Sequence, residues 1–150
     1  MSMYSSFKRN DRMEQEGIQI PYGGFKVTIA RAGGANKKFI KIMEQKSHPH
    51  RRAIATETLD ENLATELLYE AYAEGIVLDW FTETKDEDGE GTGEYVQGIE
   101  GPDGEIMKFN QENVIATFHA LPELFLEIKG QAETAGLFKA SNLAEDAKNS

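Results

Sequence analysis

The carboxylates around Asp86 are of the residue type that binds calcium. Asp86 and Asp88 alternate along the chain, and Ca²⁺ prefers hard oxygen ligands at alternating loop positions. With Asp86 first in a calcium loop, the glycine needed at the sixth position is Gly91, but the twelfth position, which needs a bidentate acid, is Gln97. The register that puts Gly89 sixth lacks an acid at either end. We therefore expect a solvated acidic loop here and no metal site.

Histidine chemistry is poorly supported by the neighbouring residues. His48 and His50 flank a proline and precede Arg51 and Arg52, and two adjacent cations oppose the binding of a divalent ion. We interpret this segment as a basic surface turn and the isolated His119 as a structural histidine. The chain has no cysteine, no GxxxxGKS/T phosphate loop and no GxSxG nucleophile motif. These patterns predict a protein that is not an enzyme and needs no cofactor.

Charge is distributed unevenly along the chain. The net charge is −10, yet residues 1–52 contain 11 Lys and Arg against 4 Asp and Glu, and residues 53–150 contain 5 against 22. This segregation predicts either pairing within the molecule or two partners of different charge. Nucleic acid is disfavoured as a partner, because the sequence pI is near 4.8 and nucleic-acid-binding domains usually exceed about 9.

Apolar runs are short throughout the sequence. None approaches the roughly 20 residues that cross a bilayer. The N-terminal segment lacks the apolar core of a secretory signal. We therefore expect no membrane partner and a chain that stays in the compartment where it is made.

The first third of the chain predicts an arm, a hairpin and a helix. Residues 1–16 are polar without a sustained period, which indicates a flexible N-terminal arm. Apolar residues alternate over 18–20 and 25–29 with turn residues between them, so these two runs predict a β-hairpin. Residues 35–46 have apolar side chains at helical spacing and predict a short basic helix.

The rest of the chain predicts long helices around one irregular segment. Apolar rows at i and i+4 predict a helix that Thr58 or Asp60 caps at its start and that ends near 79–82. Residues 83–101 predict an acidic glycine-rich loop, because each glycine inside a helix costs about 0.8 to 1 kcal/mol. Residues 95–99, inside this segment, and residues 105–109, after it, predict the two strands of a second small hairpin. Asn110 has the type of an N-cap residue for the helix that follows.

The predicted architecture is therefore α+β but mainly α. Residues 17–138 are expected to form a single mainly helical domain with one or two β-hairpins, which includes the acidic loop 83–101. Residues 139–150 are weakly apolar and are expected to form a flexible tail.

Four segments in their order resemble the tail assembly chaperones of long-tailed, siphovirus-type bacteriophages. They are the strand with KVTIARAGGANKKF, the helix closing in GIVLDWF, the element GPDGEIMKFNQEN, and LPELFLEIKGQAE leading to Phe138. The residues that carry the family pattern are Ile29, Ala30, Arg31, Trp80, Glu112, Asn113, Leu121 and Pro122. The resemblance covers about residues 17–138 and implies a family fold in which none of these residues is catalytic.

The resemblance also implies a function and partners. A chaperone of this family binds the tape measure protein, keeps it soluble and helps recruit tail tube subunits. It acts in the cytoplasm of the infected bacterial host and is absent from the mature virion. Two apolar faces are candidates for the contact surface, although the same side chains are also candidates for the core: Tyr72, Ile76 and Trp80, with Phe125 and Ile128.

Two other hypotheses remain open from the sequence. One is a structural virion subunit, in the tail or the head-tail connector. The other is an acidic inhibitor that imitates nucleic acid, which has less support because the acids lack regular spacing. Self-association and the role of the acidic loop stay open as well.

Overall fold

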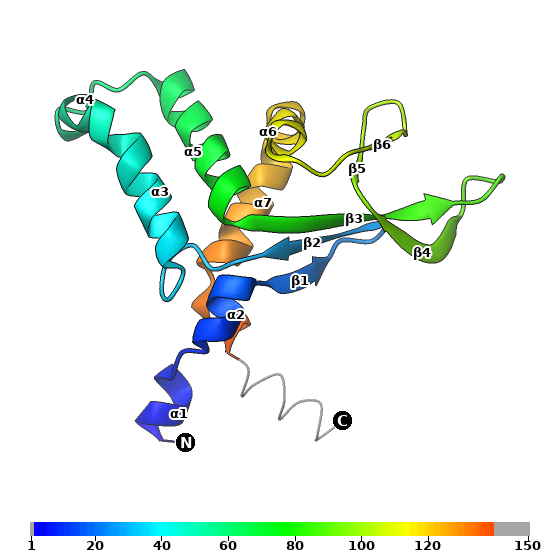
Figure 1. The fold of residues 1–150 in the computed structure, drawn as a ribbon, viewed down its shortest axis with the longest axis horizontal. Coiled ribbons are helices and arrows are strands. Elements are labelled where there is room, and N and C mark those ends of the chain that lie inside the picture. The colour runs from blue at the N-terminus through cyan, green and yellow to red at the C-terminus, as the bar shows by residue number, and fades with distance from the viewer. Residues whose placement is uncertain (1, 140–150) are drawn as a thin grey trace.

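A four-stranded antiparallel sheet crosses the middle of the molecule in the order β1-β2-β3-β4 (Figure 1). The computed structural model describes residues 2–139. A second sheet has two short strands, β5 and β6. The strands are β1 (Ile18–Pro21), β2 (Phe25–Ile29), β3 (Val77–Lys85), β4 (Gly91–Gln97), β5 (Ile99–Glu100) and β6 (Ile106–Met107).

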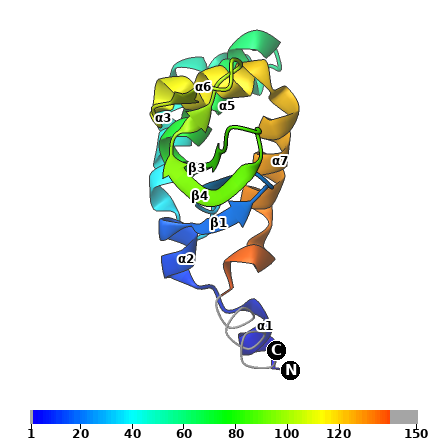
Figure 2. The same cartoon turned by 90° about the vertical axis from the view of Figure 1, so that its right-hand side faces the viewer.

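Helices surround this sheet. Figures 1 and 2 show α3, α5 and α6 above the sheet, α7 running down one side of it, and α1 and α2 below. None of the helices in the described chain is long and apolar enough to cross a membrane. The helices are α1 (Met3–Phe7), α2 (Asp11–Glu16), α3 (Lys37–Ser47), η1 (His48–His50), α4 (Arg51–Ala55), α5 (Glu61–Gly75), α6 (Gln111–Ala120), α7 (Pro122–Glu133) and η2 (Ala135–Phe138).

The prediction of a mainly helical domain with one or two hairpins is wrong. Helices take 51% and strands 21% of the described residues, so the fold is α+β in roughly balanced proportion. The two errors that matter both concern the central part of the chain, where β3 and β4 lie. For β3 the physical reason is pairing with β2, which is distant in sequence, and for β4 it is the hairpin that β4 forms with β3.

The helix α5 is shorter than its apolar pattern predicts. It begins as expected, with the side chain of Asp60 accepting a hydrogen bond from the Leu63 amide at 3.1 Å. It ends at Gly75 and the chain continues at once into β3. Because β3 pairs with both β2 and β4, its backbone groups are satisfied on both sides, and this tertiary pairing overrides the local helical period.

The segment 83–101 is not the acidic loop that its composition predicts. It holds the end of β3, all of β4 and β5, and its acids close the turns between them. The Glu83 carboxylate accepts a hydrogen bond from the Gly93 amide at 2.9 Å, and Asp86 accepts one from the Glu90 amide at 3.0 Å. The acidic side chains therefore take part in the hairpin instead of preventing it.

The N-terminal residues are also more ordered than predicted. Residues 1–16 were expected to form a flexible arm, but they contain α1 and α2, and Glu14 of α2 is only 2% exposed. Of the predicted tail 139–150, Lys139 is described and its ammonium donates to the carbonyl oxygen of Ser6. Residues 140–150 lie outside the described residues.

Several local predictions are confirmed. The hairpin over 18–29 is β1 and β2, with Ile20 paired to Val27. The basic helix over 35–46 is α3, which begins at Lys37. In the second hairpin only Ile99 and Glu100 pair with β6, since residues 95–97 belong to β4 instead.

Aromatic rings fill the core between α5, α6 and α7. Phe125 of α7 contacts Tyr69, Tyr72 and Phe118 with ring centroids 4.7 to 5.2 Å apart, all in edge-to-face arrangement. Such pairs add roughly 0.5 to 1.5 kcal/mol each beyond the burial of their area. Because Phe138 is fully buried, the packed part of the chain extends to that residue.

Candidate functional site

The five residues predicted as a contact surface are all buried. None is more than 3% exposed, so the alternative that they belong to the core is the one that the structure supports. Tyr72 of α5 packs edge to face on Phe125 of α7 with ring centroids 5.2 Å apart, and Trp80 of β3 stacks on Phe25 of β2. The prediction of a contact surface at these positions is corrected accordingly for Tyr72, Ile76, Trp80, Phe125 and Ile128.

The Ile29-Ala30-Arg31 triplet connects three parts of the fold. Ile29 is fully buried, and the Ala30 amide donates to the carbonyl of Ile76 at the end of α5 at 2.9 Å. The guanidinium of Arg31 donates to the Glu14 carboxylate at 2.6 Å, and its backbone amide donates to the Glu14 carbonyl at 3.0 Å. These residues therefore hold α2 and α5 against the end of β2 and are structural.

The second group of family-pattern residues builds the start of α6. The side chain of Asn110 accepts a hydrogen bond from the Asn113 amide at 2.8 Å, and the Asn113 side chain donates to the Lys108 carbonyl at 2.7 Å. Glu112 lies in the first turn, where its charge is favourable next to the positive end of the helix dipole. These contacts fix the direction of α6 relative to the β5–β6 hairpin.

A groove opens between α6 and the β5–β6 hairpin. Its outer cavity is about 400 Å³ in volume and its inner cavity about 120 Å³, and the two share Glu100, Thr117 and Leu121. We refer to both cavities together as the α6 groove. The outer cavity is lined by Glu100, Gly101, Pro102, Met107, Ala116, Thr117, Ala120 and Leu121. The inner cavity adds Phe25, Trp80, Thr82, Ile99 and Leu124.

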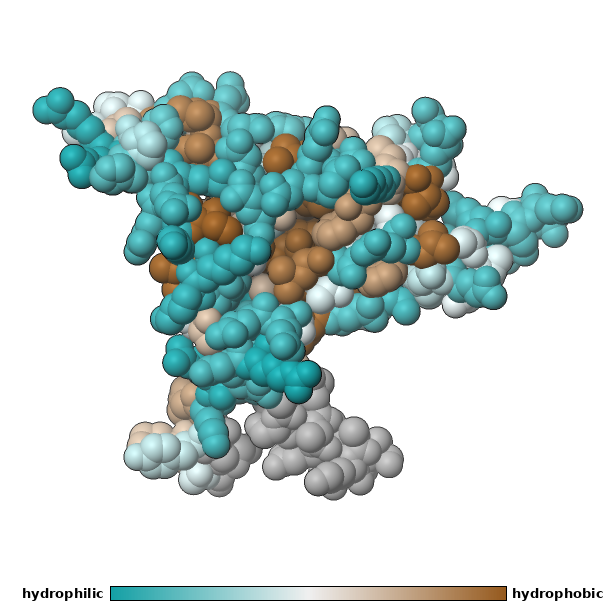
Figure 3. Space-filling view, viewed as in Figure 1, coloured by the Kyte–Doolittle hydropathy of each residue, from teal (hydrophilic) through white to brown (hydrophobic). Residues whose placement is uncertain are grey.

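The lining of the α6 groove is largely apolar and partly open to solvent. Leu121 is 54% exposed at the corner between α6 and α7, where Pro122 starts the next helix. Ala116 and Ala120 are exposed beside it, four residues apart and so on one face of α6. Figure 3 shows hydrophobic side chains gathered in the middle of the molecule, between the helices and the strands.

Two hydrogen bonds position the floor of the groove. The Thr82 hydroxyl donates to the Gly98 carbonyl at 2.9 Å, and the Gly98 amide donates to the Trp80 carbonyl at 2.9 Å. They tie β3 to the point where the chain leaves β4 for β5. The ring of Phe25 stacks on Trp80 with centroids 5.7 Å apart, so the floor is aromatic.

The aromatic stack continues from the groove to the turn between β1 and β2. Tyr22 stacks on Phe25 with ring centroids 5.1 Å apart. Its hydroxyl is buried and has no hydrogen-bond partner among the residues that the structure describes. Burial, with a further contribution from the charge of Glu127, raises the pKa of Tyr22 to about 12. The hydroxyl therefore stays neutral at physiological pH.

One acidic side chain lines the α6 groove. Glu100 lies in both cavities, and its carboxylate accepts a hydrogen bond from the Lys85 ammonium at 3.3 Å, so its charge is paired within the chain. Glu112 precedes Ala116 and Ala120 at four-residue spacing, so it continues the same face of α6. The lining of the groove is therefore mainly apolar.

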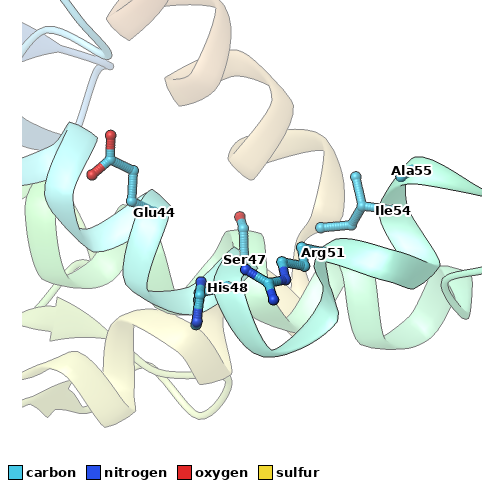
Figure 4. A pocket seen from close by; sticks show the side chains of 6 residues that line it. All are labelled: Glu44, Ser47, His48, Arg51, Ile54 and Ala55. Atoms are coloured by element: carbon cyan, nitrogen blue, oxygen red, sulfur yellow. The ribbon is translucent and has the colours of Figure 1, made fainter.

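The histidines lie apart from this groove. His48 lines a shallow hollow of about 490 Å³ along α3, η1 and α4, and Figure 4 shows that its lining side chains spread along the helix without converging on a point. His119 contacts the Glu66 carboxylate of α5 at 2.6 Å. Within residues 2–139, no three His, Asp or Glu side chains come together as a metal would require.

The groove itself was not predicted from the sequence. The only signal for it in the sequence is a group of small or apolar residues, Ala116, Ala120 and Leu121. They lie on a helix face that the apolar pattern does not predict to be buried. Such residues are common on helix surfaces, so the signal is weak. Comparisons with protein-family models, with curated proteins and with solved structures find no match for this chain.

Proposed function

We propose that the chain is a tail assembly chaperone of a long-tailed bacteriophage. In this proposal it binds an apolar helix of the tape measure protein, keeps that protein soluble and helps recruit tail tube subunits. It is not catalytic, acts in the cytoplasm of the infected bacterial host and is absent from the mature virion.

The α6 groove is the observation that carries the proposal. An amphipathic helix binds in a groove through apolar side chains at i, i+3, i+4 and i+7. The α6 groove has an apolar lining, an aromatic floor and an open side, as such a ligand requires. The strongly acidic exterior outside the groove supports solubility of a complex with an apolar partner.

Two residues of the family pattern line this groove and add support. Leu121 lines both cavities and Trp80 lies in the floor. Asn113 and Pro122 lie at the start of α6 and of α7, the helices that meet at Leu121.

Co-expression with the neighbouring tape measure gene tests the proposal. Size-exclusion chromatography should show the two proteins in one peak, and the tape measure protein should remain in the soluble fraction. Ala120→Arg places a long cation in the groove and should abolish co-elution. Ala64→Arg, on the exposed face of α5, is the matched control and should co-elute like the unchanged chain.

Two results would count against the proposal. One is precipitation of the tape measure protein in the presence of the unchanged chain. The other is the presence of this chain in purified virions at stoichiometric amounts, measured by mass spectrometry, which would favour the structural-subunit hypothesis instead.

A further inference from the structure

The short helix α1 carries apolar side chains that are largely exposed. Met3 is 66% exposed, Tyr4 78% and Phe7 77%. Together with Lys8 they line a shallow hollow of about 450 Å³. Figures 1 and 2 both show α1 projecting below the packed elements. Apolar side chains gathered in this way mark a surface that binds another segment.

The described chain ends next to this hollow. The ammonium of Lys139 lies 5.4 Å from the centre of the Phe7 ring and donates a hydrogen bond to the carbonyl oxygen of Ser6. Packed elements anchor both sides of this contact. Phe138 is fully buried, and Glu14 of α2, which follows α1 after a short link, is 2% exposed. The next residue of the sequence therefore begins within one side-chain length of α1.

The residues that follow Lys139 reach the hollow on α1. Leu143 is four residues further on, and an extended chain spans at most about 3.6 Å per residue, so Leu143 lies within roughly 14 Å of Lys139. The helix α1 has five residues and is about 7.5 Å long. The chain's own residues have an advantage over those of a second copy, because a short link keeps the local concentration of residues 140–150 in the millimolar range.

The composition of residues 140–150 matches the hollow. The segment contains three alanines and one large apolar residue, Leu143. Two acids, Glu145 and Asp146, come soon after it, against the single cation Lys148. On the side of α1, Lys8 has no ion pair with any residue from 2 to 139. A leucine followed by two acids therefore fits an apolar hollow that has an unpaired cation at its border.

We propose that residues 140–150 fold back over α1 of the same chain and cover its apolar face. Leu143 fills the hollow beside Tyr4 and Phe7, and the two acids that follow it face Lys8. The first and the last segments of the sequence then pack on each other, and α1 is stabilised by this contact. The proposal concerns a single chain and does not rest on the proposed function.

Amide hydrogen exchange of the full chain, measured by NMR, tests the proposal. The Lys8 amide donates to the Tyr4 carbonyl at 2.9 Å and so reports whether α1 is formed. Leu143→Ser removes the apolar side chain and should make exchange at the Lys8 amide about tenfold faster, as expected for the loss of a buried leucine. Asn149→Ser is the matched control in the same segment and should leave the rate unchanged. An equal rate in the unchanged chain and in Leu143→Ser would overturn the proposal.

A spin label identifies the segment that covers α1. The sequence contains no cysteine, so Asn149→Cys gives a single attachment site for the label. The label should attenuate the NMR signals of Tyr4 and Phe7 in its own chain, and adding Leu143→Ser should restore most of their intensity. This second exchange separates docking from closeness along the chain, so attenuation that Leu143→Ser leaves unchanged would contradict the proposal.

A mixed sample distinguishes the chain's own segment from that of a second copy. It contains equal amounts of isotope-labelled chain without cysteine and of spin-labelled chain at natural isotope content. The signals of Tyr4 and Phe7 should keep their full intensity in this sample. Attenuation there would assign the hollow to a second copy and overturn the proposal.

Controls separate these results from unfolding and from the proposed function. The Ile76 amide, which donates to the Tyr72 carbonyl at 3.0 Å, should exchange at the same rate in every variant, because the core is unchanged. Leu143→Met keeps the volume of the side chain and should keep exchange at the Lys8 amide slow. Leu143→Ser leaves every residue of the α6 groove in place, so co-elution with the tape measure protein is expected to be the same as for the unchanged chain.

Discussion

The buried ion pair between Glu14 and Arg31 is the most consequential side-chain contact in the molecule. The Glu14 carboxylate is almost inaccessible, whereas the Arg31 side chain keeps 22% of its exposure. Removing one partner of such a pair leaves the other charge buried and unpaired. The free-energy cost of that loss is far larger than the stability that the intact pair contributes. The Glu14 carboxylate therefore ties α2 to the segment between β2 and α3 through Arg31 and Ala35.

Glu14→Gln should therefore be strongly destabilising. The exchange keeps the shape and an acceptor for the Ala35 amide but removes the charge that faces Arg31. We expect the free energy of unfolding to fall by about 3 kcal/mol, measured by urea denaturation. Glu16→Gln is the matched control, because Glu16 pairs with Arg12 on the surface and should change stability by less than about 1 kcal/mol. Equal effects of the two exchanges would contradict this account.

The buried hydroxyl of Tyr22 predicts a loss of stability in alkaline solution. The pKa of Tyr22 is raised to about 12 in the folded chain, and an unfolded tyrosine ionises near about 10. Above pH ~10 the unfolded chain loses a proton that the folded chain keeps, so the free energy of unfolding falls as pH rises between the two pKa values. Burial, and then the charge of Glu133, raises the pKa of Tyr72 in the same direction.

Tyr22→Phe tests this expectation. The variant removes one late tyrosinate signal from an ultraviolet pH titration and should reduce the dependence of stability on pH above ~10. Near neutral pH it should be neutral or stabilising by about 1 kcal/mol, because it removes a buried hydroxyl that has no partner. An unchanged alkaline slope in denaturation experiments would show that the Tyr22 hydroxyl is not buried in solution.

At the scale of elements, short-range signals predicted well and long-range pairing did not. The hairpin β1–β2 and the Asn110 cap each depend on residues within a few positions of one another, and both are confirmed. The boundary at Gly75 was missed because apolar residues continue at helical spacing past it, while β3 is stabilised by β2, about fifty residues earlier. The segment 83–101 is an exception, because β4 pairs with the neighbouring strand β3 in a hairpin and the glycines conceal this short-range pairing in the sequence.

The turn at Gly98 predicts the sensitivity of the β5–β6 hairpin. Gly98 has φ +147°, and a Cβ there would meet the Met107 carbonyl oxygen at 2.8 Å and the side chain of Ile106. Gly98→Ala should lower the free energy of unfolding by about 1 to 3 kcal/mol through this strain and displace the hairpin that borders the groove. Gly89→Ala is the control variant. Gly89 also has positive φ, but an added Cβ would meet no other atom within 4 Å, so this variant measures the cost of the backbone conformation without the steric clash. Urea denaturation should show the larger loss for Gly98→Ala.

At the scale of the whole molecule, the candidate site could not be found from apolar periodicity alone. The pattern selected Tyr72, Trp80 and Phe125, but a helix face that buries its residues against a neighbour has the same period as one that binds a partner. Only the assembled fold shows that Leu121 stays exposed beside an opening. For this reason the exposed residues of the groove, and not the buried Trp80 of its floor, are the appropriate first substitutions in a binding experiment.

The segregation of charge along the chain is in part resolved by pairing within the molecule. Lys46 of the basic first third contacts Glu74 at 3.0 Å, between α3 and α5, and Arg31 donates to Glu14 at 2.6 Å.

The two outer strands of the main sheet have a consequence for behaviour in crowded solution. β1 ends in Pro21, which has no backbone N–H to donate, and β4 contains Glu94. Exposed strand edges are templates for intermolecular strand addition, and proline and charge on an edge oppose it. Fusion of sheets from neighbouring copies, edge to edge, is therefore disfavoured at both outer strands, which opposes aggregation at high concentration.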